Sequence, residues 1–197
     1  MTVLDVLYLA ALLQQLYAFA FHFHRPANGH RASSHWNALV LLSGGCTIST
    51  ALPLLQARPT LDSFTGIFSV LSLTSGILLF TWAAFTSRPG RFRAIFGEVK
   101  PAEVVSHGPY AYVRHPTYTS YALAWTGAIA MDLATGPGVK SAVFWAACAC
   151  FAGLLWLYQK AAEQEEAAFL TDATRATSES YKAYRQHVTA RWVPGVG

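Results

Sequence analysis

Five long apolar stretches, separated by shorter polar segments, set the pattern of this chain. They run from Val3 to about Phe23, Trp36 to Leu55, Phe64 to Phe85, Tyr118 to Met131 and Ala142 to Tyr158. The hydrocarbon core of a bilayer is crossed by roughly 20 residues of helix. The pattern therefore predicts five membrane-spanning helices, of which the fourth is short. Pro116 is expected to begin that fourth helix, because proline suits the first helical position.

The polar tail that follows the fifth stretch also has helical composition. It opens with "KAAEQEEAAFL", whose Ala, Glu, Gln and Leu are strong helix formers, so the fifth helix is expected to continue past the bilayer. The apolar residues of this extension are compatible with a face at the membrane surface: Ala161, Ala162, Phe169 and Leu170. Tyr181 and Tyr184 lie three residues apart, which puts them on one face of a further helix.

The predicted fold is therefore all-α, an integral membrane bundle of about five transmembrane helices with a cytoplasmic C-terminal helical tail. One domain covers residues 1–197. Residues 1–85 carry three spans, and residues 86–197 carry two spans and the tail.

Composition and charge support a membrane location. The chain is 53% hydrophobic and 12% charged, against about 25% charged residues in soluble proteins. With five spans, twelve Lys and Arg residues fall on one side, and only Arg58 and Lys140 on the other. The positive-inside rule then predicts that residues 86–117 and 159–197 face the cytoplasm. No basic face interleaved with stacking aromatics is present, so nucleic acid is not an expected partner.

Cysteine and histidine give little reason to expect a metal. The three cysteines form no CxxC motif and are typical of small apolar packing residues. Four histidines near the first loop, His22, His24, His30 and His35, have irregular spacing and no accompanying carboxylate. A loop at the level of the lipid headgroups is the preferred interpretation, and no metal is expected.

Polar residues gather at the start of the fourth stretch, in "SHGPYAYVRHPTYTSY". Gly108-Pro109 indicates a turn, and the Arg114 guanidinium offers a fork of donors for an anion such as a carboxylate. Interfacial anchoring by Tyr and Arg is the alternative. Glu163, Glu165 and Glu166 follow the fifth stretch. They form either a solvated helix face or a carboxylate site for a cationic ligand near Arg114.

Three segments together resemble one enzyme family. "VVSHGPYAYVRHPTYTSY", "EQEEAAFL" and "YKAYRQHVTARWVP" occur in the order found in the isoprenylcysteine carboxyl methyltransferase family, within a wider group that includes phospholipid methyltransferases. The resemblance covers about the C-terminal half of the chain. It implies a helical membrane enzyme that uses S-adenosylmethionine, bound between the loop before the Arg-His-Pro motif and the tail.

The resemblance also implies roles for individual residues. Those expected to bind the cofactor are Glu103, Val104, Val105, Tyr110, His115, Pro116, Thr117, Tyr118 and Glu165. Arg114 and Glu165 are the expected catalytic residues. The family has an Arg four residues before its Glu pair, where this chain has Ala161, so Lys160 is expected to contact the substrate carboxylate instead.

The implied reaction esterifies the C-terminal carboxylate of a prenylated cysteine, a lipid-embedded acceptor. Such a carboxylate is ionised at neutral pH, its pKa being about 3.5, so methyl transfer to it needs no general base. The enzyme is expected to lie in the endoplasmic reticulum membrane if the source is eukaryotic, with its active site facing the cytoplasm.

Three alternatives stay open at this point. A phospholipid N-methyltransferase would act on an ethanolamine amine, which must lose a proton before attack. A membrane reductase would use NADPH, and a non-catalytic membrane scaffold would bind without turnover.

Overall fold

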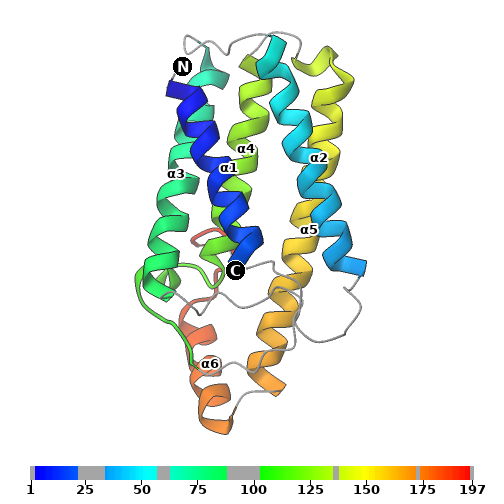
Figure 1. The fold of residues 1–197 in the computed structure, drawn as a ribbon. Coiled ribbons are helices and arrows are strands. Elements are labelled where there is room, and N and C mark those ends of the chain that lie inside the picture. The colour runs from blue at the N-terminus through cyan, green and yellow to red at the C-terminus, as the bar shows by residue number, and fades with distance from the viewer. Residues whose placement is uncertain are drawn as a thin grey trace.

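The computed structural model describes residues 3–21, 34–56, 63–87, 103–134, 138–171 and 174–195. These residues form six α-helices and two short 3₁₀ helices, with no strand among the described elements (Figure 1). The helices are α1 (Val3–Phe21), α2 (Ser34–Gln56), α3 (Phe64–Ser87), α4 (Pro116–Ala134), α5 (Ala142–Thr171) and α6 (Arg175–His187). The 3₁₀ helices are η1 (Gly108–Ala111) and η2 (Gly138–Lys140). The all-α prediction is therefore confirmed.

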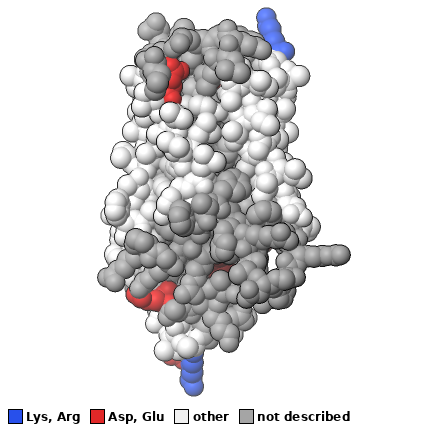
Figure 2. Space-filling model, in the orientation of Figure 1, with Lys and Arg blue, Asp and Glu red and all other residues white. Residues whose placement is uncertain are grey.

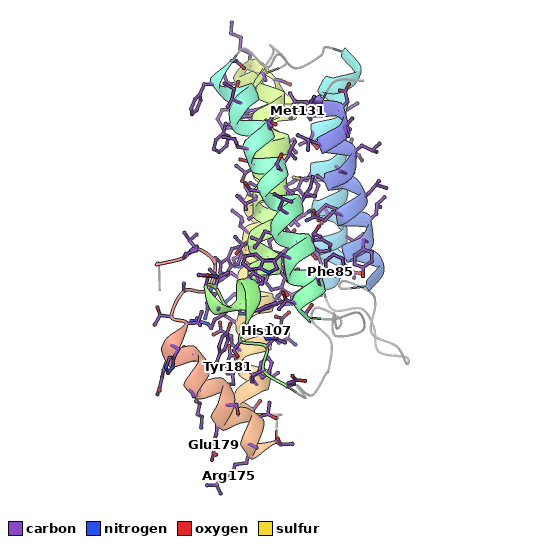
Figure 3. All side chains as sticks on the ribbon, turned by 90° about the vertical axis from the view of Figure 1, so that its left-hand side faces the viewer. Phe85, His107, Met131, Arg175, Glu179 and Tyr181 are labelled. Atoms are coloured by element: carbon purple, nitrogen blue, oxygen red, sulfur yellow. The ribbon has the colours of Figure 1, made fainter. Side chains whose placement is uncertain are left out.

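The five long helices run side by side, and α6 lies beyond one end of their bundle (Figure 1). α3 packs along α4, α2 packs along α5, and α1 lies mainly against α3. α4 is the central helix, since 13 of its 19 residues are buried. Figure 3 shows His107 and Tyr181 beyond the end of the bundle that Phe85 marks, whereas Met131 lies at the opposite end.

Glycines let α3 and α4 approach closely. A Cβ on Gly76 would lie 3.0 Å from the backbone nitrogen of Ala124, and one on Gly127 would lie 2.9 Å from that of Leu73. The Ser69 hydroxyl donates to the Gly127 carbonyl at 2.8 Å. Small residues and a serine hydrogen bond are the usual means of close helix packing in membranes, and here they fix the helix that leads into the polar end of the bundle.

The outer surface of the bundle is strongly apolar. Large exposed side chains follow one another along the outer helices, including Leu13, Leu41, Leu71 and Leu78. On the face in Figure 2, the Lys, Arg, Asp and Glu residues that the structure describes lie towards the two ends. By length and composition, α3 and α5 qualify as membrane-crossing helices, and Val3–Tyr17 and Asn37–Leu52 are shorter apolar stretches. The count of five spans and the cytoplasmic side of the tail stay predictions.

Two details differ from the sequence expectations. α4 begins at Pro116 as expected but continues to Ala134, three residues past its apolar stretch, and Asp132 and Ala134 are buried there. Ala161 and Ala162 do not lie at a membrane surface. Both are fully buried in the bundle core, and Phe169 stacks on Tyr181 of α6 with the ring centroids 4.5 Å apart. The extension of α5 is thus covered by protein at these positions.

Candidate functional site

A tight turn carries the chain into α4. Gly108 has φ +61°, a conformation that side-chain-bearing residues rarely adopt, and a Cβ there would lie 2.6 Å from Oγ1 of Thr86. Pro109 follows, and the 3₁₀ helix η1 confirms the predicted turn. Pro116 then begins α4, as predicted. The turn holds Arg114 and His115 at the end of the bundle.

The C-terminal tail pairs with this segment through the backbone. The N–H groups of Arg114 and His115 donate to the carbonyls of Ala190 and Arg191, each at 3.0 Å. Hydroxyl groups strengthen the pairing, since Thr119 Oγ1 donates to the Trp192 carbonyl at 2.8 Å. The tail is therefore laid directly over the start of α4.

Helix α6 positions the tail for this pairing. It begins at its N-cap Thr174, whose hydroxyl accepts from the N–H of Thr177 at 3.3 Å. The hydroxyl of Tyr184 donates to the Tyr110 carbonyl at 2.8 Å. Burial raises the pKa of Tyr184, so its phenol keeps the proton that this bond needs.

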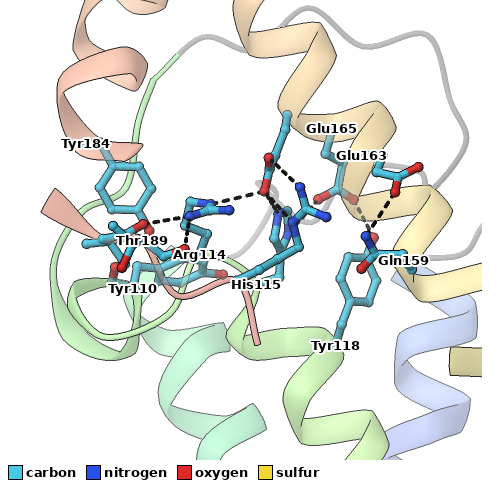
Figure 4. A network of polar contacts seen from close by, with 12 residues as sticks. Tyr110, Arg114, His115, Tyr118, Gln159, Glu163, Glu165, Tyr184 and Thr189 are labelled. Atoms are coloured by element: carbon cyan, nitrogen blue, oxygen red, sulfur yellow. Dashed lines mark hydrogen bonds and ion pairs between the residues drawn. The ribbon is translucent and has the colours of Figure 1, made fainter. Parts of the chain in front are cut away.

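Glu166 is the centre of a polar cluster at this end of the bundle, where Figure 4 shows Arg114 and His115 close together. Its Oε1 accepts from Nε of Arg114 at 3.1 Å and lies 3.1 Å from Nε2 of His115. Arg191 donates to both oxygens, from Nε and Nη2, at 3.0 Å each. One buried carboxylate therefore joins α5, the segment before α4 and the tail, positions that are far apart in the sequence.

Arg114 also ties the tail through carbonyl groups. Its Nη1 donates to the carbonyl of Val188 at 2.8 Å and to that of Thr189. The Arg114 side chain is 7% exposed. Much of its donor capacity is thus already used within the protein, which makes Arg114 a residue that positions the tail.

The charges of the cluster stabilise one another. Burial alone would raise the pKa of Glu166, but hydrogen bonds from His115, Arg191 and Arg114 hold it well below its usual range. Burial alone would lower the pKa of His115, but its contacts with Glu165 and Glu166 outweigh burial and raise it. The imidazole therefore favours its charged form between two carboxylates.

Glu165 marks the open side of the same cluster. Its Oε2 lies 3.4 Å from Nδ1 of His115, and its Oε1 accepts from the hydroxyl of Tyr118. The Glu165 side chain is 38% exposed, against 5% for Glu166. The rings of His115, Tyr118 and Tyr158 stack beneath it, with centroid distances of 5.7 and 5.5 Å. This carboxylate is held in place and is still partly exposed to solvent.

The structure brings together some of the residues predicted for the site and leaves others apart. Arg114, His115, Tyr118 and Glu165 meet in the cluster. Pro116 and Thr117 are buried in the first turn of α4. Of the segment before η1, Glu103 is exposed, and Val104 and Val105 are partly buried, as is Tyr110 within η1. Lys160 forms an exposed pair with Glu163 at 2.9 Å and makes no described contact with the cluster.

Sequence reasoning missed Arg191 and the central position of Glu166. Arg191 stands in the "ARWVP" end of a segment that carried the family resemblance, but the resemblance implied no role for this arginine. Its distance of 25 residues from Glu166 leaves no local signal for the ion pair. The described residues contain no cluster of His, Cys, Asp and Glu able to hold a metal. The His22, His24 and His30 loop lies outside the described residues.

Comparison with known sequences agrees with this geometry. The profile of the isoprenylcysteine carboxyl methyltransferase (ICMT) family matches residues 69–171, just over half of the chain. This match spans α3 to α5 and includes the Arg-His-Pro segment and both glutamates of the cluster. The protein belongs to the isoprenylcysteine carboxyl methyltransferase family. No curated protein matches the chain.

Proposed function

We propose that this protein is a membrane S-adenosylmethionine-dependent methyltransferase that esterifies the C-terminal carboxylate of a prenylated cysteine. One observation carries the proposal. The three segments that define the motif converge on Glu166, beside the half-open carboxylate of Glu165. Family membership indicates the methyltransferase class, and the cofactor and acceptor are our inference.

A membrane location follows from the surface of the bundle. Phe64 and Phe85 of α3 are 83% and 79% exposed, and the helical rise places them about 31 Å apart. That distance matches the hydrocarbon core of a bilayer, about 30 Å. The polar cluster would then lie just outside the lipid, where a water-soluble cofactor meets a lipid-embedded acceptor.

The residues on the open side fit S-adenosylmethionine. This cofactor carries a sulfonium, an amino group and ribose hydroxyls, all of which suit a carboxylate acceptor, and Glu165 offers one. Partly buried Val104 and Val105 provide apolar surface on the segment before η1. We assign cofactor binding to Glu165, His115 and Tyr118 together with residues 103–105 and Tyr110. When bound, the cofactor supplies an electrophilic methyl group.

The chain's own contribution is positioning and exclusion of water. A carboxylate acceptor is already ionised at neutral pH, so no side chain has to remove a proton. Holding two reactants in the right orientation contributes roughly 7–11 kcal/mol to a reaction of this kind. Arg114, Glu166 and Arg191 fix the tail over the site, and Tyr118 and His115 fix the Glu165 carboxylate.

Methyl transfer by the purified protein in detergent tests the proposal. Labelled S-adenosylmethionine is supplied with N-acetyl-S-farnesylcysteine and, in parallel, with phosphatidylethanolamine. We expect base-labile label on the farnesylcysteine, and loss of this label in the Glu165→Gln variant. Base-stable label on the lipid would instead establish an N-methyltransferase. A protein that does not bind S-adenosylmethionine would contradict the methyltransferase proposal.

A further inference from the structure

A basic groove lies between the tail and the extension of α5. It has a volume of about 580 Å³ and is lined by Arg114, Gln159, Arg185, Thr189, Arg191, Trp192 and Val193. Three of these residues are arginines, and none of the seven is acidic. Such a lining favours an anion, and the Trp192 and Val193 side chains give the groove an apolar part.

The three arginines are not equivalent. Arg191 donates to Glu166 from Nε and Nη2. Arg114 donates to Glu166 from Nε and to a tail carbonyl from Nη1. Arg185 is exposed in the last turn of α6. Within the described chain, no hydrogen bond or ion pair engages its guanidinium. Arg185 therefore has its full fork of donors available to a bound group.

The basic residue of α5 is not in this position. Lys160 does not line the groove, and its ammonium contacts the Glu163 carboxylate at 2.9 Å. Ala161, next in the chain, is fully buried in the bundle core. The cationic donors that face the groove come instead from the tail and from the segment before α4.

We propose that this groove binds the carboxylate of the methyl acceptor, and that Arg185 is the residue that selects for that carboxylate. The inference rests on the proposed function. Arg114 and Arg191 supply positive potential while staying paired with Glu166, and Arg185 supplies the charge-assisted hydrogen bonds. Trp192 and Val193 cover the apolar part of the acceptor next to its carboxylate. Selection of the acceptor thus resides in α6 and the tail that follows it.

Equilibrium binding without turnover tests this assignment. N-acetyl-S-farnesylcysteine and its neutral carboxamide are titrated into the full-length protein in lipid nanodiscs, using the wild type, Arg185→Gln and Lys182→Gln. Lys182 is the matched control because it is an exposed cation of the same helix that does not line the groove. The wild type and Lys182→Gln should bind the acid about tenfold more tightly than the amide. In Arg185→Gln the ratio should fall to about one to two, since one charged hydrogen-bond partner is gone.

Three outcomes would overturn the inference. The first is no preference for the acid in the wild type. The second is an unchanged acid preference in Arg185→Gln with S-adenosylmethionine affinity also unchanged. The third is an unchanged acid preference in Arg185→Gln with a weakened S-adenosylmethionine affinity. The last would assign the groove to the cofactor. Because binding is measured without methyl transfer, failure of the groove assignment is distinguished from failure of the proposed function, which the transfer assay reports.

Discussion

Two neighbouring glutamates divide the polar cluster into a closed side and an open side. Glu166, on the closed side, is 5% exposed and has two arginines and a histidine around it. Glu165, on the open side, is 38% exposed and touches His115 and Tyr118. Adjacent positions on a helix point about 100° apart, so one residue step separates a buried, ion-paired carboxylate from a partly exposed one. His115 contacts both carboxylates and couples the two sides.

The largest expected effect comes from breaking the closed side with Glu166→Gln. Removing one partner of a buried ion pair leaves uncompensated charge and costs about 3–5 kcal/mol. For a chain of this size we expect the Tm in detergent to fall by on the order of 10 °C. Glu163→Gln is the control, because its solvent-exposed pair with Lys160 contributes little to stability. Equal Tm values for the two variants would contradict the closed-side assignment.

Changing the open side with Glu165→Gln should separate function from stability. The amide keeps the shape of the side chain and removes the negative charge. Loss of one charged hydrogen-bond partner weakens binding by about tenfold to a hundredfold, and we expect that loss in the S-adenosylmethionine Kd. The Tm should change far less than in Glu166→Gln. Titration calorimetry and thermal unfolding of the same preparation check both expectations.

The pH dependence of stability reports on the histidine between the two sides. The raised pKa of His115 means that its contribution is fully present below about pH 6.5, the usual imidazole value, and is lost as the pH rises through the raised value. Glu166 has the opposite pH dependence. Because its pKa is lowered, its contribution to the stability of the fold is lost only at strongly acidic pH. The groups facing His115 are Glu165 and Glu166 of α5 and Tyr118 of α4. Tm should therefore decline on the alkaline side, and His115→Gln should flatten that decline.

Lys160→Gln is expected to have the smallest effect. Its side chain is 45% exposed and already paired with Glu163, and such exposed pairs contribute little to stability. Tm should be unchanged, and the KM for the farnesylcysteine acceptor should stay close to that of the wild type. A large rise in KM would restore Lys160 as the substrate contact that the family resemblance suggested, and would weaken the case for Arg185.

Hydropathy and motif order predicted much of this architecture. The five apolar stretches correspond to α1–α5, Pro116 begins α4, and α5 continues through the glutamate pair to Thr171. The motifs also predicted site roles for Arg114, His115, Tyr118 and Glu165, and the structure brings these four residues together. These features depend on local composition or on a pattern that the family shares.

The family resemblance singled out Glu165, but nothing in the sequence placed Glu166 at the centre of the ion pairs. Which of two adjacent residues faces the tail depends on the rotation of α5 in the bundle, which long-range packing sets. The same holds for Ala161, whose burial follows from the helices around it. Arg191 joins the cluster only because the tail folds back and pairs with Arg114 and His115, just before α4.

The central claim is that the open side of the cluster binds the cofactor while the closed side maintains the fold. The most direct test is S-adenosylmethionine binding to wild type, Glu165→Gln and Glu163→Gln, with Tm measured on each sample. The account predicts tight binding by the wild type and Glu163→Gln, and a loss of at least about tenfold in Glu165→Gln at nearly unchanged Tm. Unaltered binding by Glu165→Gln, or no binding by the wild type, would contradict it.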